Sequence, residues 1–159
     1  MRLYCGLSYD EVVHRYAPAV HSACVMRLGG HIDADDCFQN TFLRLYTSSP
    51  AFRDEEHLKA WLLHVAVNEC RKFLRDNRRI LSLDSVGEIP VEPPDDEADI
   101  SWAILRLEPK YREVLYLYYG EGYKTEEIAR ILDRNPATVR TMLRRGREKL
   151  RKIYGGDEK

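Results

Sequence analysis

Residues 126–152, EEIARILDRNPATVRTMLRRGREKLRK, decide the fold of this chain, because they predict two helices joined by a tight turn. In the turn at 133–135, Asn135 is placed to cap the second helix. Pro136 suits the first position of that helix, since its missing N–H would be unpaired there anyway. Each helix carries one apolar face at helical spacing. These faces comprise Ile128, Ala129, Ile131 and Leu132 in the first helix, and Val139, Leu143, Gly146 and Leu150 in the second.

The opposite face of the second helix is strongly basic. Its single acid, Glu148, is too little for i,i+4 salt bridges to neutralise the face. A short helix, a tight turn and a basic second helix with an apolar back are typical of a helix-turn-helix. A duplex phosphate backbone attracts such a face, so we predict DNA binding rather than an ordinary solvated face. The bases are Arg140, Arg144, Arg145, Arg147, Lys149, Arg151 and Lys152.

Charge is distributed unevenly along the 159 residues. The net charge is +1 over residues 1–79, −7 over residues 80–99, which contain no base, and +5 over residues 100–159. This division predicts a near-neutral front module, an acidic connector and a basic end module, each with different partners. Residues 80–99 have no helical period and are rich in proline and acids. They are expected to form an extended linker, or a disordered tether with no further role.

Three helices are predicted in residues 8–79. Ser8 and Glu11 form a capping box that begins the first helix, and the Gly-Gly pair at 29–30 ends it. Asp33 is expected to cap the second helix, and the third is expected to run from about Glu55 to Arg78. Their apolar stripes can share one core. The residues expected to face it are Val12, Val13, Tyr16, Val20, Ala23, Cys24, Phe38, Phe42, Leu45, Leu58, Trp61, Leu62, Val65, Ala66, Phe73 and Leu74.

Residues 100–153 predict further helices. A short helix follows the linker, and Pro109 begins another that closes at Gly120 and Gly122. No segment alternates polar and apolar residues as a half-buried strand would. The fold class is therefore predicted to be all-α, with two small helical domains joined by the extended acidic linker.

Several functional classes are disfavoured by the sequence. No stretch approaches the ~20 apolar residues of a membrane span, and the N-terminus lacks the apolar run of a signal peptide, so a cytoplasmic protein without membrane insertion is expected. No Gly-rich phosphate loop, Ser-His-Asp order or catalytic carboxylate pair predicts an enzyme or a cofactor. The aspartates at 33, 35 and 36 complement a helix dipole rather than predict a metal site. The four cysteines form no CxxC pair, and buried, reduced thiols are expected at Cys24, Cys37 and Cys70.

Five segments in order resemble one known family, the extracytoplasmic-function type sigma factors of the sigma-70 family of bacterial RNA polymerase. The first two are residues 33–42, DADDCFQNTF, similar to dAeDxxQexF, and residues 60–68, AWLLHVAVN, similar to aWLxxiaxN. The others are residues 107–114, LEPKYREV, residues 121–129, EGYKTEEIA, and residues 138–147, TVRTMLRRGR, similar to LpxxyReV, exGyxxeEIA and TVkSrlxRar. The resemblance covers nearly all of residues 8–153. The chain departs from the family pattern at Asn40, Lys72, Met142 and Gly146, where Glu, Asp, a basic residue and Ala are common.

The resemblance implies a role for each part of the chain. Residues 8–79 would form a region 2-like three-helix bundle that binds core polymerase and the −10 promoter element. Residues 80–99 would be the acidic linker that threads a basic polymerase channel, and residues 100–153 a region 4-like helix-turn-helix that binds the −35 element. A helix-turn-helix repressor or response-regulator output domain could share the last module, but would not need the two front motifs.

The resemblance also implies site residues. For the −35 element these are Arg140, Thr141 and Arg144 at base edges, Lys124, Thr125 and Arg145 at phosphates, and Pro136, Ala137 and Thr138 at the start of the recognition helix. For the −10 element they are Trp61, Asn68, Arg71, Arg75 and Arg78, although the apolar stripe favours a core position for Trp61. For core polymerase they are Asp36, Gln39, Asn40 and Phe42.

The implied partners are core RNA polymerase, through its β′ clamp helices and β flap, promoter DNA and an anti-sigma protein. Association with the nucleoid is expected when the protein is bound to polymerase. The long linker would let the two modules clasp a partner, or each other, at high effective concentration.

Overall fold

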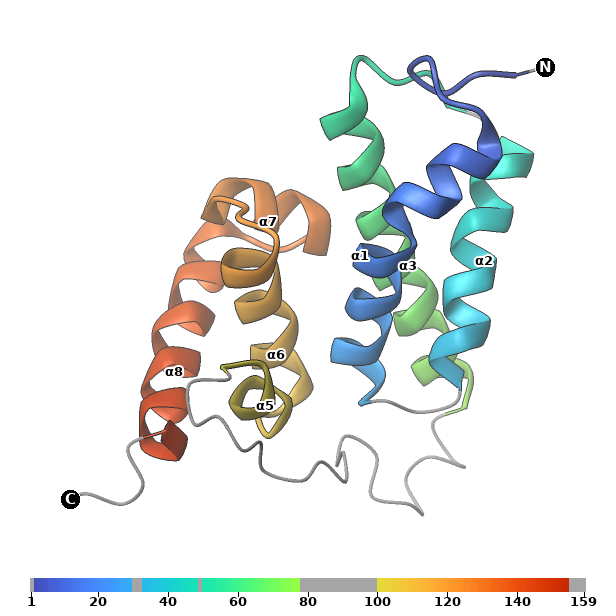
Figure 1. The fold of residues 1–159 in the computed structure, drawn as a ribbon. Coiled ribbons are helices and arrows are strands. Elements are labelled where there is room, and N and C mark those ends of the chain that lie inside the picture. Colours follow the sequence, from blue (N-terminus) through green and yellow to red (C-terminus); the bar gives the residue numbers. More distant parts are fainter. Residues whose placement is uncertain (1, 30–32, 49, 78–99, 155–159) are drawn as a thin grey trace.

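The computed structural model describes residues 2–29, 33–48, 50–77 and 100–154, and the linker predicted at 80–99 lies outside them. Within these ranges the chain is helical and contains no strand, only an isolated bridge between Tyr4 and Leu7. The prediction of an all-α fold is confirmed. Two groups of helices lie side by side, joined by the residues drawn in grey (Figure 1). They are α1 (Tyr9–Leu28), α2 (Asp33–Ser48) and α3 (Glu55–Asp76), and α5 (Ile100–Leu105), α6 (Pro109–Leu115), the π-helix η1 (Tyr116–Gly120), α7 (Thr125–Leu132) and α8 (Pro136–Tyr154).

The front module, α1 to α3, begins with the predicted capping box. The amide of Glu11 donates to Ser8 Oγ at 3.1 Å, and the Glu11 carboxylate accepts from the Ser8 amide at 2.8 Å. Gly29 ends α1 in the left-handed conformation, at φ 77°. One boundary was predicted wrongly, because Asp33 is the first residue of α2 rather than its cap. Helix α3 begins at Glu55, as predicted, and ends at Asp76, two residues before the approximate end predicted, where the side chain and amide of Asn77 bond to a carbonyl of its last turn.

One core joins the three front helices, as predicted. Val12, Leu45 and Leu62, one from each helix, are completely buried in it. The thiols of Cys24, Cys37 and Cys70 lie in the same core, and all four cysteines of the chain are free. Five residues predicted to point inward are only half-buried at its edge: Val13, Phe38, Trp61, Phe73 and Leu74.

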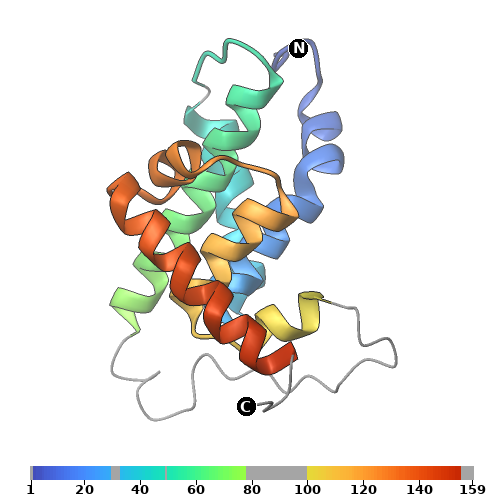
Figure 2. The ribbon, with the colours of Figure 1, turned by 90° about the vertical axis from the view of Figure 1, so that its left-hand side faces the viewer.

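The helix-turn-helix of the end module consists of α7 and α8. Helix α7 ends at Leu132 and is capped by Asp133, which adopts the left-handed conformation at φ 54°. Asn135 Oδ1 accepts from the Ala137 amide at 2.8 Å and caps α8. All eight apolar residues predicted for the two helices are buried. Helix α8 lies on the side of this module away from the front module, as the turned view shows (Figure 2).

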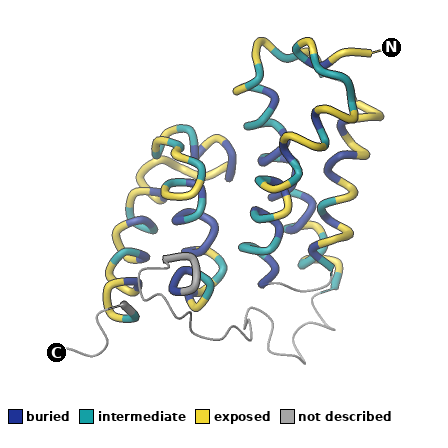
Figure 3. The backbone as a smooth tube through the Cα atoms, in the orientation of Figure 1, coloured by how far each residue is buried: buried dark blue, intermediate teal, exposed yellow. Residues whose placement is uncertain are grey.

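The two modules contact each other directly, through α1 and α3 on one side and α6, η1 and α7 on the other. Buried residues line the facing sides of both groups (Figure 3). Ala23, Leu63 and Val67 belong to front helices, yet they are buried in the core of the end module. The apolar pattern alone did not reveal this second use of α1 and α3.

Candidate nucleic-acid and polymerase interfaces

The start of α8 presents the residues predicted to contact the −35 element. Pro136, Ala137 and Thr138 are exposed, and Arg140 and Arg144 project from the same face one turn apart. Val139 and Leu143, by contrast, are buried and pack α8 against its own module. Thr141 is half-buried beside them, and Arg145 is exposed. Arg144 lies 3.8 Å from Glu148, the one acid of this face, in an exposed pair that contributes little to stability.

The start of α7 supplies the residues predicted to contact phosphates. Lys124 is exposed, and its amide donates to the Glu127 carboxylate at 2.8 Å. The Thr125 hydroxyl donates to Glu126 at 3.2 Å. A helix N-terminus carries partial positive charge, so Lys124 and Thr125 stand where an anion is favoured.

Two bases of α8 pack on tyrosine rings, which was not predicted: Lys149, 5.6 Å from the ring centre of Tyr111, and Arg147. Arg147 Nε donates to the Tyr119 hydroxyl at 2.8 Å. Its guanidinium lies 5.2 Å from the ring centre of Tyr118 and 5.8 Å from that of Tyr119. The cation therefore fixes α8 to η1 and is not free to turn toward DNA.

Three of the residues predicted for the −10 element follow one face of α3, and two of them are already engaged. Arg71 donates to the Leu132 carbonyl of α7 at 2.6 Å, and burial lowers the pKa of its guanidinium. The Asn68 amide lies 3.1 Å from His64 Nε2. Arg75 is exposed and lies 3.7 Å from Asp76. Arg78 falls outside the described residues.

Trp61, about two turns before Asn68 on α3, is half-buried. Its ring lies edge-on to Phe52, with 5.6 Å between the ring centres, and Phe52 lies edge-on to His57 at 5.3 Å. The loop before α3 thus packs on Trp61, which lies at the edge of the core rather than within it.

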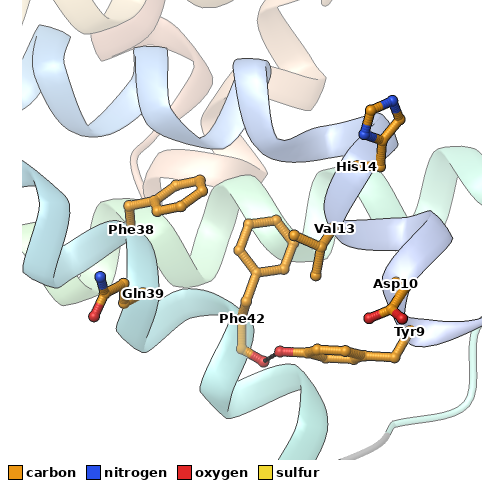
Figure 4. Close-up of a pocket in the computed structure, with 7 residues that line it drawn as sticks. All are labelled: Tyr9, Asp10, Val13, His14, Phe38, Gln39 and Phe42. Atoms are coloured by element: carbon orange, nitrogen blue, oxygen red, sulfur yellow. Dashed lines mark hydrogen bonds between the residues drawn. The ribbon is translucent and has the colours of Figure 1, made fainter.

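The exposed face of α2 adjoins an apolar groove between α1 and α2 (Figure 4). Asp36, Gln39 and Asn40 are exposed, as predicted. Phe42 is only 4% exposed, because its ring lies on the core side of the groove, so it offers less surface to a partner than predicted. The groove is lined by Tyr9, Asp10, Val13, His14, Phe38, Gln39 and Phe42.

Two residues that the sequence analysis passed over extend this face. Leu43 is 56% exposed and Tyr46 is 59% exposed, and both follow Gln39 at helical spacing. Large apolar side chains that are exposed in a row beside a groove are typical of a protein-binding surface. Their spacing from Gln39 was visible in the sequence and would have identified them.

Neither a metal site nor a membrane span is found in the described ranges. There, no three His, Cys, Asp or Glu side chains come together as ligands for a metal ion. Nor is any of the helices in those ranges both long enough and apolar enough to span a bilayer.

Comparisons with known proteins match both modules to the same family. Residues 12–80 match the family profile of Sigma-70 region 2, and residues 99–150 match that of Sigma-70 region 4. The chain is 28% identical to the RNA polymerase sigma factor CarQ of Myxococcus xanthus, over 93% of this chain and 90% of CarQ. It is also 28% identical to the ECF RNA polymerase sigma factor SigW of Bacillus subtilis, over 91% of this chain and 88% of SigW.

Solved structures show the same fold. The sigma factor RpoE of Bartonella quintana, in complex with the anti-sigma factor NepR, aligns with a TM-score of 0.74 at 22% identity, over 94% of this chain and 98% of RpoE. CnrH, in complex with the cytosolic domain of CnrY, aligns with a TM-score of 0.62 at 23% identity, over 94% of this chain and 89% of CnrH.

The packing of Arg147 leads to a prediction about stability. Arg147→Ala should lower the free energy of unfolding by about 1 kcal/mol, since it removes a hydrogen bond and cation–π contacts to two tyrosines. Arg145→Ala, at an exposed neighbour on the same helix, should change it by less than about 0.5 kcal/mol. Urea denaturation followed by circular dichroism measures both. Equal effects of the two substitutions would show that the tyrosine contacts contribute nothing.

Proposed function

This chain belongs to the extracytoplasmic-function type of the sigma-70 family, whose members direct core RNA polymerase to promoters, and we propose a division of that work among its parts. Residues 8–79 bind core polymerase and the −10 element, residues 80–99 are the linker, and residues 100–153 bind the −35 element. The observation that carries this proposal is the capped, outward-facing α8, which keeps Arg140 and Arg144 exposed on one face while Val139 and Leu143 stay buried.

Direct contact with −35 base edges is assigned to Arg140, Thr141 and Arg144. A guanidinium fork matches the two acceptors of a guanine in the major groove. Lys124, Thr125 and Arg145 contact phosphates, which position the helix without selecting sequence. Pro136, Ala137 and Thr138 present a small, exposed helix start that lets α8 approach the groove.

Binding of the opened −10 element is assigned to the α3 face with Asn68, Arg71 and Arg75, and to Arg78, which lies outside the described residues. A separated strand needs cationic groups along its backbone and a surface for exposed bases. Phe52, in the loop before α3, packs on Trp61 near the N-terminal end of that helix. The two rings supply apolar surface there.

Docking on the β′ clamp helices is assigned to Asp36, Gln39 and Asn40 of α2, with the adjoining groove as the seat for an apolar side chain. Phe42 forms the floor of that groove, and its backbone carbonyl accepts a hydrogen bond from the Tyr9 hydroxyl at 2.8 Å. Leu43 and Tyr46 widen the surface. Exposed polar residues beside an apolar groove match the polar rim and apolar centre of a protein interface.

The remaining partners are proposed on the same basis. The β flap binds the end module, and an anti-sigma protein binds the free factor, as NepR and CnrY bind their sigma factors. The protein acts in the cytoplasm, at the nucleoid when bound to polymerase, and has no enzymatic activity of its own. A helix-turn-helix repressor would bind DNA without polymerase, so co-purification with core polymerase separates the two functions.

The clamp assignment can be tested by a double substitution. Asp36→Ala combined with Gln39→Ala should weaken binding to core polymerase at least tenfold, because both side chains are exposed on the docking face and neither supports the core. Arg15→Ala is the matched control, since Arg15 is exposed on α1 but faces Glu55 of α3. Fluorescence anisotropy of the labelled protein gives the affinities. If the double variant binds as tightly as the control, α2 does not form the interface.

The recognition helix can be tested by base preference. Arg140→Ala and Arg144→Ala should each relax the preference at one or two −35 base pairs, since a bidentate contact provides about 1–3 kcal/mol of discrimination. Lys152→Ala, near the end of α8, should weaken all promoters alike or have no effect. Transcription from a set of single-base −35 variants measures the profiles. A uniform loss with unchanged profiles would place both arginines among the phosphate contacts.

A further inference from the structure

Arg147 lies on the same side of α8 as the two arginines assigned to −35 base edges. It follows Arg144 by three residues and Arg140 by seven, and side chains at these spacings share one face of a helix. By its position, Arg147 would continue this row of bases along a DNA duplex. Arg147 is nevertheless half-buried, whereas Arg140 and Arg144 are exposed. The position on the helix therefore does not by itself decide which bases of α8 contact DNA.

Two tyrosines of η1 hold the side chain of Arg147. Its Nε donates to the Tyr119 hydroxyl at 2.8 Å, and its guanidinium carbon lies 5.2 Å from the ring centre of Tyr118 and 5.8 Å from that of Tyr119. The two rings contact each other edge to face, with 4.9 Å between their centres. An aromatic face attracts a cation, and the hydrogen bond fixes the direction of the guanidinium. We call this group of Tyr118, Tyr119 and Arg147 the tyrosine clamp.

The tyrosine clamp depends on the geometry of η1. In this π-turn the Glu121 amide donates to the Tyr116 carbonyl, five residues earlier, at 3.1 Å. Such turns are rare and are frequent at functional sites. A π-turn spreads one turn over more residues than an α-helix does, so neighbouring side chains diverge less and both Tyr118 and Tyr119 reach Arg147. Gly120 permits this turn, because a Cβ at that position would lie only 2.9 Å from Tyr116 Cδ1.

The clamp restrains Arg147 without neutralising it. The hydroxyl and the rings that hold the guanidinium are uncharged, so Arg147 keeps its full positive charge beside Arg144. A phosphate that recruited Arg147 would have to replace one hydrogen bond and two ring contacts at once. An exposed arginine such as Arg140 has no such contacts to give up with a tyrosine pair and can turn toward an anion.

We propose that Tyr118 and Tyr119 limit the DNA footprint of α8 by withholding Arg147 from the phosphate backbone. This inference rests on the proposed function of α8 in −35 binding. A cation on phosphate strengthens binding to every sequence alike, whereas contacts with base edges select a sequence. The clamp thus keeps sequence-independent binding low while Arg140 and Arg144 stay available to the bases. Tyr118 and Tyr119 are positioning residues that act through Arg147.

The salt dependence of duplex binding by the full chain tests whether Arg147 is withheld. Fluorescence anisotropy with a short duplex of mixed sequence gives the affinity at each salt concentration. Each phosphate contact contributes about 0.9 to the slope of log affinity against log salt. Arg147→Gln should leave the slope of the wild type unchanged, whereas Arg145→Gln should lower it by about 0.9. An equal decrease for both substitutions would overturn the proposal.

Release of the clamp should change the slope in the opposite direction. Tyr118→Leu combined with Tyr119→Leu removes both rings and should steepen the slope by about 0.9, so affinity falls about threefold more than in the wild type between 50 and 200 mM salt. Adding Arg147→Gln to this double variant should abolish the increase. General loss of packing would not depend on Arg147 in this way. A slope that does not rise, or that rises equally without Arg147, would contradict the proposal.

Hydrogen exchange reports the clamp without DNA. In NMR spectra of the full chain, the Nε–H of Arg147 should exchange with water several-fold more slowly than that of Arg140, because it is bonded to Tyr119 and half-buried. Tyr119→Phe keeps the ring and removes the hydroxyl, so it should bring the two exchange rates together without unfolding the module. Equal rates in the wild type would show that the clamp is open in solution and would overturn the proposal.

Arg145→Gln separates a failure of the clamp from a failure of the proposed function. If it leaves the slope unchanged, α8 does not bind phosphates, and the proposed −35 role fails together with the clamp. If it lowers the slope while the tyrosine variants do not raise it, the −35 role stands and only the clamp fails.

Discussion

The arrangement of the two modules depends on how two helix ends are satisfied. Helices α1 and α7 both end against the other module, where their last carbonyls are removed from water. A carbonyl buried without a donor costs about 1–3 kcal/mol, so the position of each end is restricted to places where a donor is available. Arg112 supplies it for α1, and Arg71 with His64 supplies it for α7. Because the donors come from opposite modules, one relative orientation satisfies both ends at once.

The recognition helix α8 is likewise positioned by contacts with neighbouring helices. Helix α8 lies close to α6, and a Cβ on Gly146 would approach Leu115 Cδ1 to 3.2 Å. Gly146 therefore permits this close packing of α8 on α6, and the next residue, Arg147, packs on Tyr118 and Tyr119. Because this part of α8 is packed on its own module, Arg140 and Arg144, which precede it, are exposed on a fixed helix. Direct contact with nucleotide base edges requires that the exposed arginine side chains project from a rigidly held helix.

Local signals in the sequence predicted local structure well. The Ser8 capping box, the Asn135 cap, the Pro136 start and the apolar faces of α7 and α8 were all confirmed, because each depends on residues within a few positions of one another. The resemblance to a family placed Asp36, Gln39 and Asn40 on an exposed face. The roles assigned to these residues stay predictions.

What the sequence could not predict depends on contacts between distant segments. Arg71 was assigned to DNA, and its spacing on α3 gave no sign of the Leu132 carbonyl 61 positions later. Arg112 lies in a family motif, yet nothing nearby predicted a fully buried guanidinium. Arg147 looked like one more exposed base until η1 placed two tyrosines beside it. Phe42 was correctly placed on an apolar stripe, and the same burial limits its surface for a partner.

The most direct test of the central claim is run-off transcription with core RNA polymerase on genomic fragments, with and without this protein. The claim predicts start sites that appear only when both are present, each preceded by a shared pair of −10 and −35 sequences. It is contradicted if no start site depends on the protein.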